Sequence, residues 1–226
     1  MRGLFVTGTG TGVGKTIVSA ALLAAMRDAG EQVRAYKPVV TGLAEPPGPW
    51  PPDHELLGLA AGMAPEEVAP LRFGPAVSPH LAASLSGESV DTAALVERAK
   101  ATASNGATLI VEGVGGLLVP LADDFTVRDL AVELALPLVI AASPELGTIN
   151  HTLLTIEAAR AVGLSVAAVV VTPLPSEPSQ MERSNCETIA RLGTIEVATL
   201  DELANPDVAN LAGLGEGVPW RDWLTR

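Results

Sequence analysis

The sequence predicts an α/β fold, a P-loop NTPase-like arrangement with a mostly parallel β-sheet flanked by helices on both faces. Short apolar runs alternate with Ala/Leu-rich stretches of helical period, the order typical of βα units with right-handed crossovers. The apolar runs lack strict in/out alternation, as expected for strands covered on both faces. The expected strands are Gly3–Thr7, Gln32–Tyr36, Thr108–Val111, Leu138–Ala142, Val166–Val171 and Ile195–Leu200. The expected helices are Lys15–Ala29, Asp53–Ala61, Asp91–Ser104, Val127–Leu134, Thr148–Val162 and Pro178–Leu192.

Cap residues support several of these helix boundaries. Gly30 and Gly163 stand where helix-ending glycines belong. Asp91 and Thr126 are expected N-caps, because a short oxygen-bearing side chain can accept a hydrogen bond from a free N–H of the first turn.

Two proline-rich stretches interrupt the alternation. Residues 42–52 contain five prolines and are expected to form an exposed, stiff loop. Residues 70–80 form a second proline-interrupted connection. The tail after Asp201 is acidic, and its end is expected to be a short helix pinned by Trp220 and Trp223.

Composition favours a globular protein that binds neither nucleic acid nor membranes. The 226 residues are expected to form one domain, residues 1–226. With 26 acidic and 14 basic side chains, the formal net charge of -12 repels nucleic acid and anionic lipid. The apolar segments are broken by Glu133, Pro137 and Pro144 before they reach the ~18 residues of a membrane span. No signal peptide is recognised, and the single cysteine, Cys186, favours a reducing compartment, so a cytoplasmic location is expected.

The stretch VTGTGTGVGKT, between the first expected strand and the first expected helix, is typical of a phosphate-binding loop. Its glycines allow successive N–H groups to face a phosphate, and the helix start adds a positive end. Lys15 suits the β- and γ-phosphates, and the Thr16 hydroxyl suits Mg²⁺. The spacing is unusual, because Thr9 replaces the glycine of the common pattern and Gly8 lies one residue farther from Gly14. The plainer alternative is a glycine-rich turn with a surface lysine.

Three later residues are candidates to complete this site. Glu112 follows an apolar strand, and the carboxyl end of a buried parallel strand is where a Mg²⁺ ligand is expected. Lys37 ends the second strand and points toward the same edge of the sheet. Asp53 follows the proline-rich loop. The alternatives are a solvated strand end for Glu112 and Lys37 and a helix cap for Asp53.

Five stretches together resemble the dethiobiotin synthetase family over residues 3 to about 175. The unusual spacing of the phosphate loop is that family's own form. The stretches are VTGTGTGVGKT, YKPVVTG, SPHLAA, VEGVGGLLVPL and ELGTINHTLLT.

The resemblance implies an ATP-dependent carboxylation and ring closure in biotin synthesis. The substrates are 7,8-diaminononanoate, CO₂ and a nucleoside triphosphate, with Mg²⁺ as cofactor. One amine captures CO₂ as a carbamate, the carbamate attacks the γ-phosphate to give a carbamic–phosphoric anhydride, and the second amine displaces phosphate. The family is homodimeric, with active sites at the subunit interface.

The resemblance also assigns roles to individual residues. Lys15 and Lys37 are the implied catalytic residues, and Thr16, Asp53 and Glu112 the implied metal ligands. The implied nucleotide-binding residues are Gly12, Val13, Gly14, Lys15, Thr16, Ile17, Asp53, Glu112, Gly113, Val114, Gly115, Thr172 and Pro173. The implied substrate-binding residues are Thr11, Lys37, Thr41, Leu146, Gly147, Thr148, Ile149 and Asn150, of which those from Leu146 to Asn150 serve the neighbouring subunit.

The helix that follows Gly147 is expected to contribute to the dimer interface. Ile149, Leu153, Ile156 and Val162 lie along largely one side of it. Without the resemblance, this stripe is assigned to the core of its own chain. With the resemblance, it is expected to reach across a two-fold axis.

The chain departs from some relatives at the base site and in the loop. Where some relatives carry an asparagine that reads adenine, this chain has Thr172–Pro173, so loose base selectivity is expected. Positions 10 and 12, acidic in some relatives, are both glycine. His54, His80 and His151 offer no metal cluster; His80 and His151 are expected to be structural or peripheral, and no role is predicted for His54.

Three alternatives to this function remain open at this stage. A partition or septum-positioning ATPase shares the fold but needs a lysine where this chain has Gly10. A cobyrinate-type amidotransferase needs a glutaminase domain with a nucleophilic cysteine, and Cys186 lies in no nucleophile elbow. A phosphate-binding module without enzymatic activity is the third alternative.

Overall fold

The computed structural model describes residues 1–46, 48 and 50–226. A six-stranded sheet forms its centre, with strand order β10-β9-β8-β1-β5-β2 and every neighbouring pair parallel. The predicted mostly parallel sheet is therefore confirmed. Its strands are β1 (Gly3–Gly8), β2 (Val33–Tyr36), β5 (Thr108–Glu112), β8 (Leu138–Ala142), β9 (Val166–Leu174) and β10 (Val197–Asp201).

Helices and short strands fill the connections. The helices are α1 (Lys15–Asp28), α2 (Asp53–Ala61), α3 (Pro65–Val68), α4 (Pro79–Leu85), α5 (Thr92–Thr102), α6 (Val127–Leu134), α7 (Thr148–Arg160), α8 (Gln180–Gly193), α9 (Val208–Glu216) and α10 (Trp220–Trp223), with a 3-10 turn at Ser104–Gly106. The short strands are β3 (Val39–Val40), β4 (Leu71–Arg72), β6 (Pro120–Ala122) and β7 (Phe125–Thr126). The sequence analysis did not predict α3, α4, α9 or these short strands.

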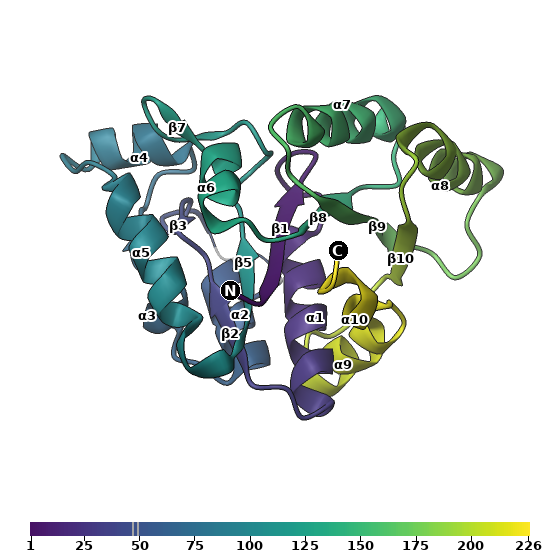
Figure 1. Cartoon of the computed structure of the whole chain (residues 1–226), viewed down its shortest axis with the longest axis horizontal. Helices are drawn as coiled ribbons and strands as arrows, with labels where there is room; N and C mark the ends of the chain where they lie inside the picture. Colours follow the sequence, from purple (N-terminus) through teal and green to yellow (C-terminus); the bar gives the residue numbers. More distant parts are fainter. Residues whose placement is uncertain (47, 49) are drawn as a thin grey trace.

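Helices cover both faces of the sheet (Figure 1). Leu4 and Val6 of β1 pack in one core with α1, α2, α9 and α10. Phe5, the residue between them, packs in a second core with α5 and α6. A third core joins β8 and β9 to α7 and α8. Because successive strand residues face opposite layers, both sets of side chains must be apolar, which explains the missing in/out alternation.

Strand order places a crevice at the end of β1. The chain runs from β1 to the sheet edge at β2, returns to β5, and then crosses to β8 on the other side of β1. At such a reversal, the connections that follow adjacent strands lie on opposite faces of the sheet. This leaves a crevice outside the carboxyl ends of the strands, and ligands bind in such crevices. The glycine-rich loop begins there.

Most predicted boundaries agree with the structure, with small shifts. The side chain of Asp91 accepts from Ala94 N–H at 2.9 Å, and Thr126 Oγ1 accepts from Asp129 N–H at 3.3 Å, so both predicted N-caps are confirmed. Strand β10 begins two residues later than expected.

The irregular stretches are also largely as predicted. In the proline-rich loop, residues 43–46, 48, 51 and 52 are exposed, and residues 47 and 49 lie outside the described part of the chain. Near the C-terminus, Trp220 and Trp223 are buried. Trp223 Nε1 donates to Glu196 Oε1 at 3.0 Å, so the predicted terminal helix is pinned as expected.

Helix α7 corrects the expectation for the apolar stripe. Ile156 is buried, and Ile149 and Leu153 pack with it in the third core. Val162 lies beyond the end of the helix. The stripe therefore belongs to the core of its own chain, because β8, β9 and α8 cover it. The exposed apolar side chain of α7 is Leu154 instead.

Within the described residues, no helix has the length and apolar character needed to cross a membrane.

Helices α1 and α9 approach closely, and they lie side by side in Figure 1. A Cβ atom placed on Gly215 of α9 lies only 2.1 Å from the carbonyl oxygen of Ala21 of α1. Gly213, two residues earlier, has open space at the same position.

We expect Gly215→Ala to lower the free energy of unfolding by about 1–3 kcal/mol, because the added methyl group forces the two helices apart. Gly213→Ala is the matched control, and we expect it to stabilise the protein by about 0.5–1 kcal/mol through helix propensity. Chemical denaturation of both variants measures the difference. Equal stability of the two variants would contradict the close approach.

Candidate active site

The phosphate loop joins β1 to α1 in a conformation that requires glycine at its end. Gly14 has φ 86° and caps α1. A Cβ at this position lies 2.5 Å from Thr172 Cγ2, so both the backbone angle and the neighbouring side chain exclude larger residues. Thr172 of β9 therefore lies directly against the loop. The free N–H groups at the start of α1 suit an anion.

Lys15 lies over this loop and is buried. Its Nζ donates to the carbonyl oxygen of Gly10 at 2.7 Å. Burial, helped by the nearby Lys37 ammonium, lowers the pKa of Lys15 to about 8, although Glu112 and Asp53 act in the opposite direction. Lys15 therefore loses its proton at a lower pH than a solvated lysine does.

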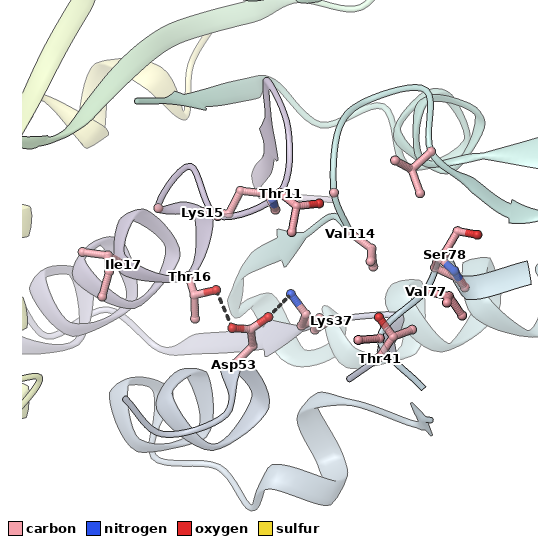
Figure 2. Close-up of a pocket in the computed structure, with 16 residues that line it drawn as sticks. Thr11, Lys15, Thr16, Ile17, Lys37, Thr41, Asp53, Val77, Ser78 and Val114 are labelled. Atoms are coloured by element: carbon pink, nitrogen blue, oxygen red, sulfur yellow. Dashed lines mark hydrogen bonds and ion pairs between the residues drawn. The ribbon is translucent and has the colours of Figure 1, made fainter. Parts of the chain in front are cut away.

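Three oxygen-bearing side chains and one ammonium converge below the loop, and Figure 2 shows Thr16, Asp53 and Lys37 of this set. Thr16 Oγ1 lies 2.9 Å from Asp53 Oδ1 and 3.0 Å from Glu112 Oε1. Lys37 Nζ lies 2.8 Å from Asp53 Oδ2 and also donates to Glu112 Oε1. These residues come from the start of α1, the end of β2, the start of α2 and the end of β5. The predicted convergence at the carboxyl edge of the sheet is therefore present.

Charge pairing keeps the Lys37 ammonium and the Asp53 carboxylate ionised. Burial disfavours the Lys37 ammonium, but the attraction of Glu112 and Asp53 outweighs it and raises the pKa of Lys37. Burial also acts to raise the pKa of Asp53, but Lys37 and the Thr16 hydrogen bond lower it overall. Asp53 is the first residue of α2, and Pro52 occupies the cap position, so Asp53 is not a helix cap.

The oxygen atoms of this cluster fit a divalent cation such as Mg²⁺. Glu112 is 0% exposed, and among the described residues its Oε2 atom has no hydrogen-bond partner. A buried carboxylate oxygen without a partner is costly and is often a ligand atom. Two carboxylates and one hydroxyl are the hard oxygen donors that Mg²⁺ prefers.

A pocket of about 680 Å³ opens beside this cluster. Of the predicted residues it is lined by Thr11, Gly12, Gly14, Lys15, Thr16, Ile17, Lys37, Thr41, Asp53, Val114 and Gly115. Residues 76–79 and Val119 also line it. From the sequence, residues 70–80 were expected only to form a connection. The stretch SPHLAA, which begins at Ser78, could have indicated that this connection reaches the pocket.

Other predicted residues lie near the pocket without lining it. Glu112 lies buried beneath it in the cluster. Val13 packs against the first core. Gly113 is buried and its N–H donates to the carbonyl oxygen of Val6 at 2.9 Å. Thr172 contacts the loop from the side, and Pro173 is exposed.

The described residues Leu146 to Asn150 do not line the pocket of their own chain. Leu146 is 90% exposed and Asn150 is exposed, whereas Thr148 is buried. Helix α7, which begins within this stretch, borders a second hollow of about 470 Å³, on the other side of the phosphate loop. That hollow is lined by loop residues 9–11, residues 116–120 and the outer side of α7, including His151 and Leu154.

The remaining histidines lie in surrounding helices. His54, beside Asp53, is buried, and this burial lowers its pKa. His80 belongs to α4, whose first residue, Pro79, lines the pocket.

Comparisons with known proteins identify relatives over most of the chain. A family model described as "AAA domain" matches residues 2–204. The chain is 44% identical over 214 residues to the "ATP-dependent dethiobiotin synthetase BioD" of Anaeromyxobacter dehalogenans, covering 94% of each chain. It is 35% identical over 210 residues to the protein of the same name from Bacillus subtilis, covering 91% of this chain and 89% of the relative.

A solved structure shares the fold. The MinC:MinD cell division protein complex of Aquifex aeolicus contains a chain with a TM-score of 0.57 and 16% identity, and the match covers 96% of this chain and 87% of that one. At this identity the likeness concerns the fold alone. It agrees with the predicted P-loop NTPase-like class.

We expect the affinity for a nucleoside triphosphate to fall as pH rises through about 8, the pKa of Lys15. The charged form binds phosphate, so above this pH binding must take up a proton, and affinity should decline by up to roughly tenfold per pH unit. Lys37 does not contribute to this decline, because its pKa is raised.

Calorimetric titration with a non-hydrolysable triphosphate from about pH 7 to about pH 10 measures the slope. Lys15→Arg is the control, because a guanidinium stays charged throughout. The assignment to Lys15 is wrong if the arginine variant shows the same decline.

Proposed function

Because this chain belongs to the ATP-dependent dethiobiotin synthetase family, whose members are ligases, we propose that it forms dethiobiotin from 7,8-diaminononanoate, CO₂ and ATP or another nucleoside triphosphate. One observation carries the proposal: a phosphate loop with Lys15 faces a second buried lysine, Lys37, across one pocket. Such an arrangement brings a triphosphate and a second anion together.

The proposed reaction has three steps. One amine of the diamine loses a proton and attacks CO₂, which gives a carbamate. A carbamate oxygen attacks the γ-phosphorus, the bond to the nucleoside diphosphate breaks, and a carbamic–phosphoric anhydride forms. The second amine attacks the carbonyl carbon and expels phosphate, which closes the ureido ring.

The positive charges of the two lysines offset the repulsion between a carbamate and a triphosphate, which is the main physical obstacle to the reaction. Lys15 binds the phosphates, and Lys37 lies beside the carbamate. Preorganised charge of this kind is usually the largest contribution to catalysis. Thr11 and Thr41, which line the same pocket, hydrogen-bond the amine or the carbamate.

Thr16, Asp53 and Glu112 hold Mg²⁺ in this proposal, and the donor set and the unpartnered Glu112 Oε2 support the assignment. The ion supplies positive charge beside the phosphates. Gly113, Val114 and Gly115 allow the phosphates close approach to the backbone after β5. Gly12, Val13, Ile17, Thr172 and Pro173 complete the proposed nucleotide site.

We propose a homodimer in which each pocket is completed by the other chain. The described residues Leu146 to Asn150 do not line their own pocket, whereas the next residue, His151, and other residues of α7 line the second hollow beside the phosphate loop. Leu118 and Leu154 are 54% and 55% exposed and offer apolar surface for association. Backbone N–H groups at the start of α7 and the side chain of Asn150 of the partner subunit then bind the substrate carboxylate.

We propose that residues 1–226 form one catalytic domain that acts in the cytoplasm. The single cysteine, Cys186, supports this location, because proteins of oxidising compartments commonly carry paired cysteines.

Phosphate release that depends on both diaminononanoate and bicarbonate tests this function. We expect Lys37→Ala and Lys15→Ala to lower turnover by roughly 10²-fold or more while the fold survives, since each removes one charge from the reacting anions. Product mass confirms that a ring has formed. Phosphate release unaffected by the diamine, or near-normal turnover of folded Lys37→Ala, would refute the corresponding part of the proposal.

Mixing two inactive variants tests the shared site. We expect Lys15→Ala protein and Asn150→Trp protein to recover activity when subunits exchange, toward half of the wild-type value per dimer, because one of the two sites then carries neither defect. Steady-state turnover of the mixture is the measurement.

A mixture of Lys15→Ala and Lys37→Ala is the matched control. Both lysines line the pocket of one chain, so no intact site forms and no recovery is expected. If the Asn150 mixture also fails to recover after demonstrated exchange, Asn150 serves its own chain.

A further inference from the structure

Lys37 contacts both carboxylate groups that fit a divalent cation. Its Nζ lies 2.8 Å from Asp53 Oδ2 and also contacts Glu112 Oε1. Lys37 is 2% exposed and Glu112 is 0% exposed. Glu112 Oε1 also accepts from Thr16 Oγ1 at 3.0 Å. One ammonium thus touches both carboxylates of the proposed Mg²⁺ site.

An ammonium and a divalent cation on the same two carboxylates lie close together. Their like charges therefore repel strongly, because Lys37 and Glu112 are buried. Conversely, without any cation the buried Glu112 carboxylate would be left without a partner charge and would be repelled by the half-exposed Asp53. The negative charge of the two carboxylates is therefore compensated by either a lysine ammonium or a metal ion.

The pocket gives the ammonium another place to lie. Lys37 itself lines the pocket, together with Thr41 and Ser78. In Figure 2 the Lys37 amine points toward Asp53, and Thr41, Val77 and Ser78 lie on its other side. A rotation of the flexible lysine stem can carry the charge from the carboxylates to the hydroxyl-bearing side of the pocket.

We propose that Lys37 is the built-in counter-ion of the metal site and that divalent cation binding displaces its ammonium from Asp53 and Glu112 into the pocket. The displaced charge then faces the position where the proposed function places the carbamate, and that last point rests on the proposed function. The displacement itself rests on the contacts of Lys37 and on the oxygen atoms proposed to hold the metal ion. Lys37 consequently weakens metal binding to the free protein and couples it to anion binding in the pocket.

Metal affinity of the nucleotide-free protein tests the competition, with Mn²⁺ as a spectroscopic probe for free ion and Mg²⁺ as competitor. Lys37→Met keeps a long side chain without the charge. We expect it to bind Mn²⁺ at least roughly tenfold more tightly than the wild type. Lys15→Met is the matched control: it removes an equal charge whose Nζ contacts the Gly10 carbonyl oxygen rather than the carboxylates, and we expect a smaller change.

Three outcomes overturn the proposal. They are equal Mn²⁺ affinity in the wild type and Lys37→Met, no Mn²⁺ binding to either protein, and an equal gain in Lys15→Met. The last outcome would indicate a general charge effect. None of these measurements uses turnover, so a protein without synthetase activity can still show the competition, and an active synthetase can fail to show it.

A measurement on the wild-type chain covers the case in which Lys37→Met does not fold. Peptide mass spectrometry after brief amine labelling, without nucleotide, reports how accessible each lysine is. We expect saturating Mg²⁺ to increase labelling of Lys37 several-fold, whereas Lys100, which pairs with exposed Glu97, serves as the internal control. Labelling of Lys37 that does not change with Mg²⁺ would overturn the displacement.

Discussion

The buried carboxylate of Glu112 requires a cation beside it, and the arrangement of the site follows from this requirement. A carboxylate that is 0% exposed is stable in its ionised form only if positive charge or hydrogen-bond donors replace water. Strand β5 lies between β1 and β2, so the phosphate loop with Lys15 and Thr16 lies on one side of Glu112 and Lys37 on the other. Asp53 completes the cluster, so charged groups of both signs meet at one edge of the sheet.

Local patterns were sufficient to predict the central units of the fold and the charged centre of the site. Strand β1, its loop and α1 are contiguous, and the residues after β2 and β5 lie at one edge because parallel strands end there. The remainder depends on contacts between distant segments. Residues 76–79 follow a segment that is held by Val39–Val40 pairing with Leu71–Arg72 and by the Gly42 N–H donating to the Pro75 carbonyl oxygen. Short strands broken by prolines carry no periodic signal.

Helix α7 illustrates a second limit of sequence patterns. The period of Ile149, Leu153 and Ile156 identifies one apolar side correctly, but a period does not tell whether that side meets its own chain or another. In the structure it meets β8, β9 and α8. The surface available for association is the opposite side, with Leu154, and the isolated exposed leucines that mark it have no distinctive spacing in the sequence.

The close fit of α9 on α1 has a consequence for the order in which the molecule is completed. Helix α1 is synthesised well before α9, yet α9 covers one part of its apolar surface. The phosphate loop is continuous with α1, so the helix that anchors the loop cannot reach its final packing before α9 has been synthesised. Contacts of such long sequence separation form late and slowly. The part of α1 that faces α9 therefore stays uncovered until α9 has been synthesised, although α2 and the sheet can cover the rest of the helix earlier.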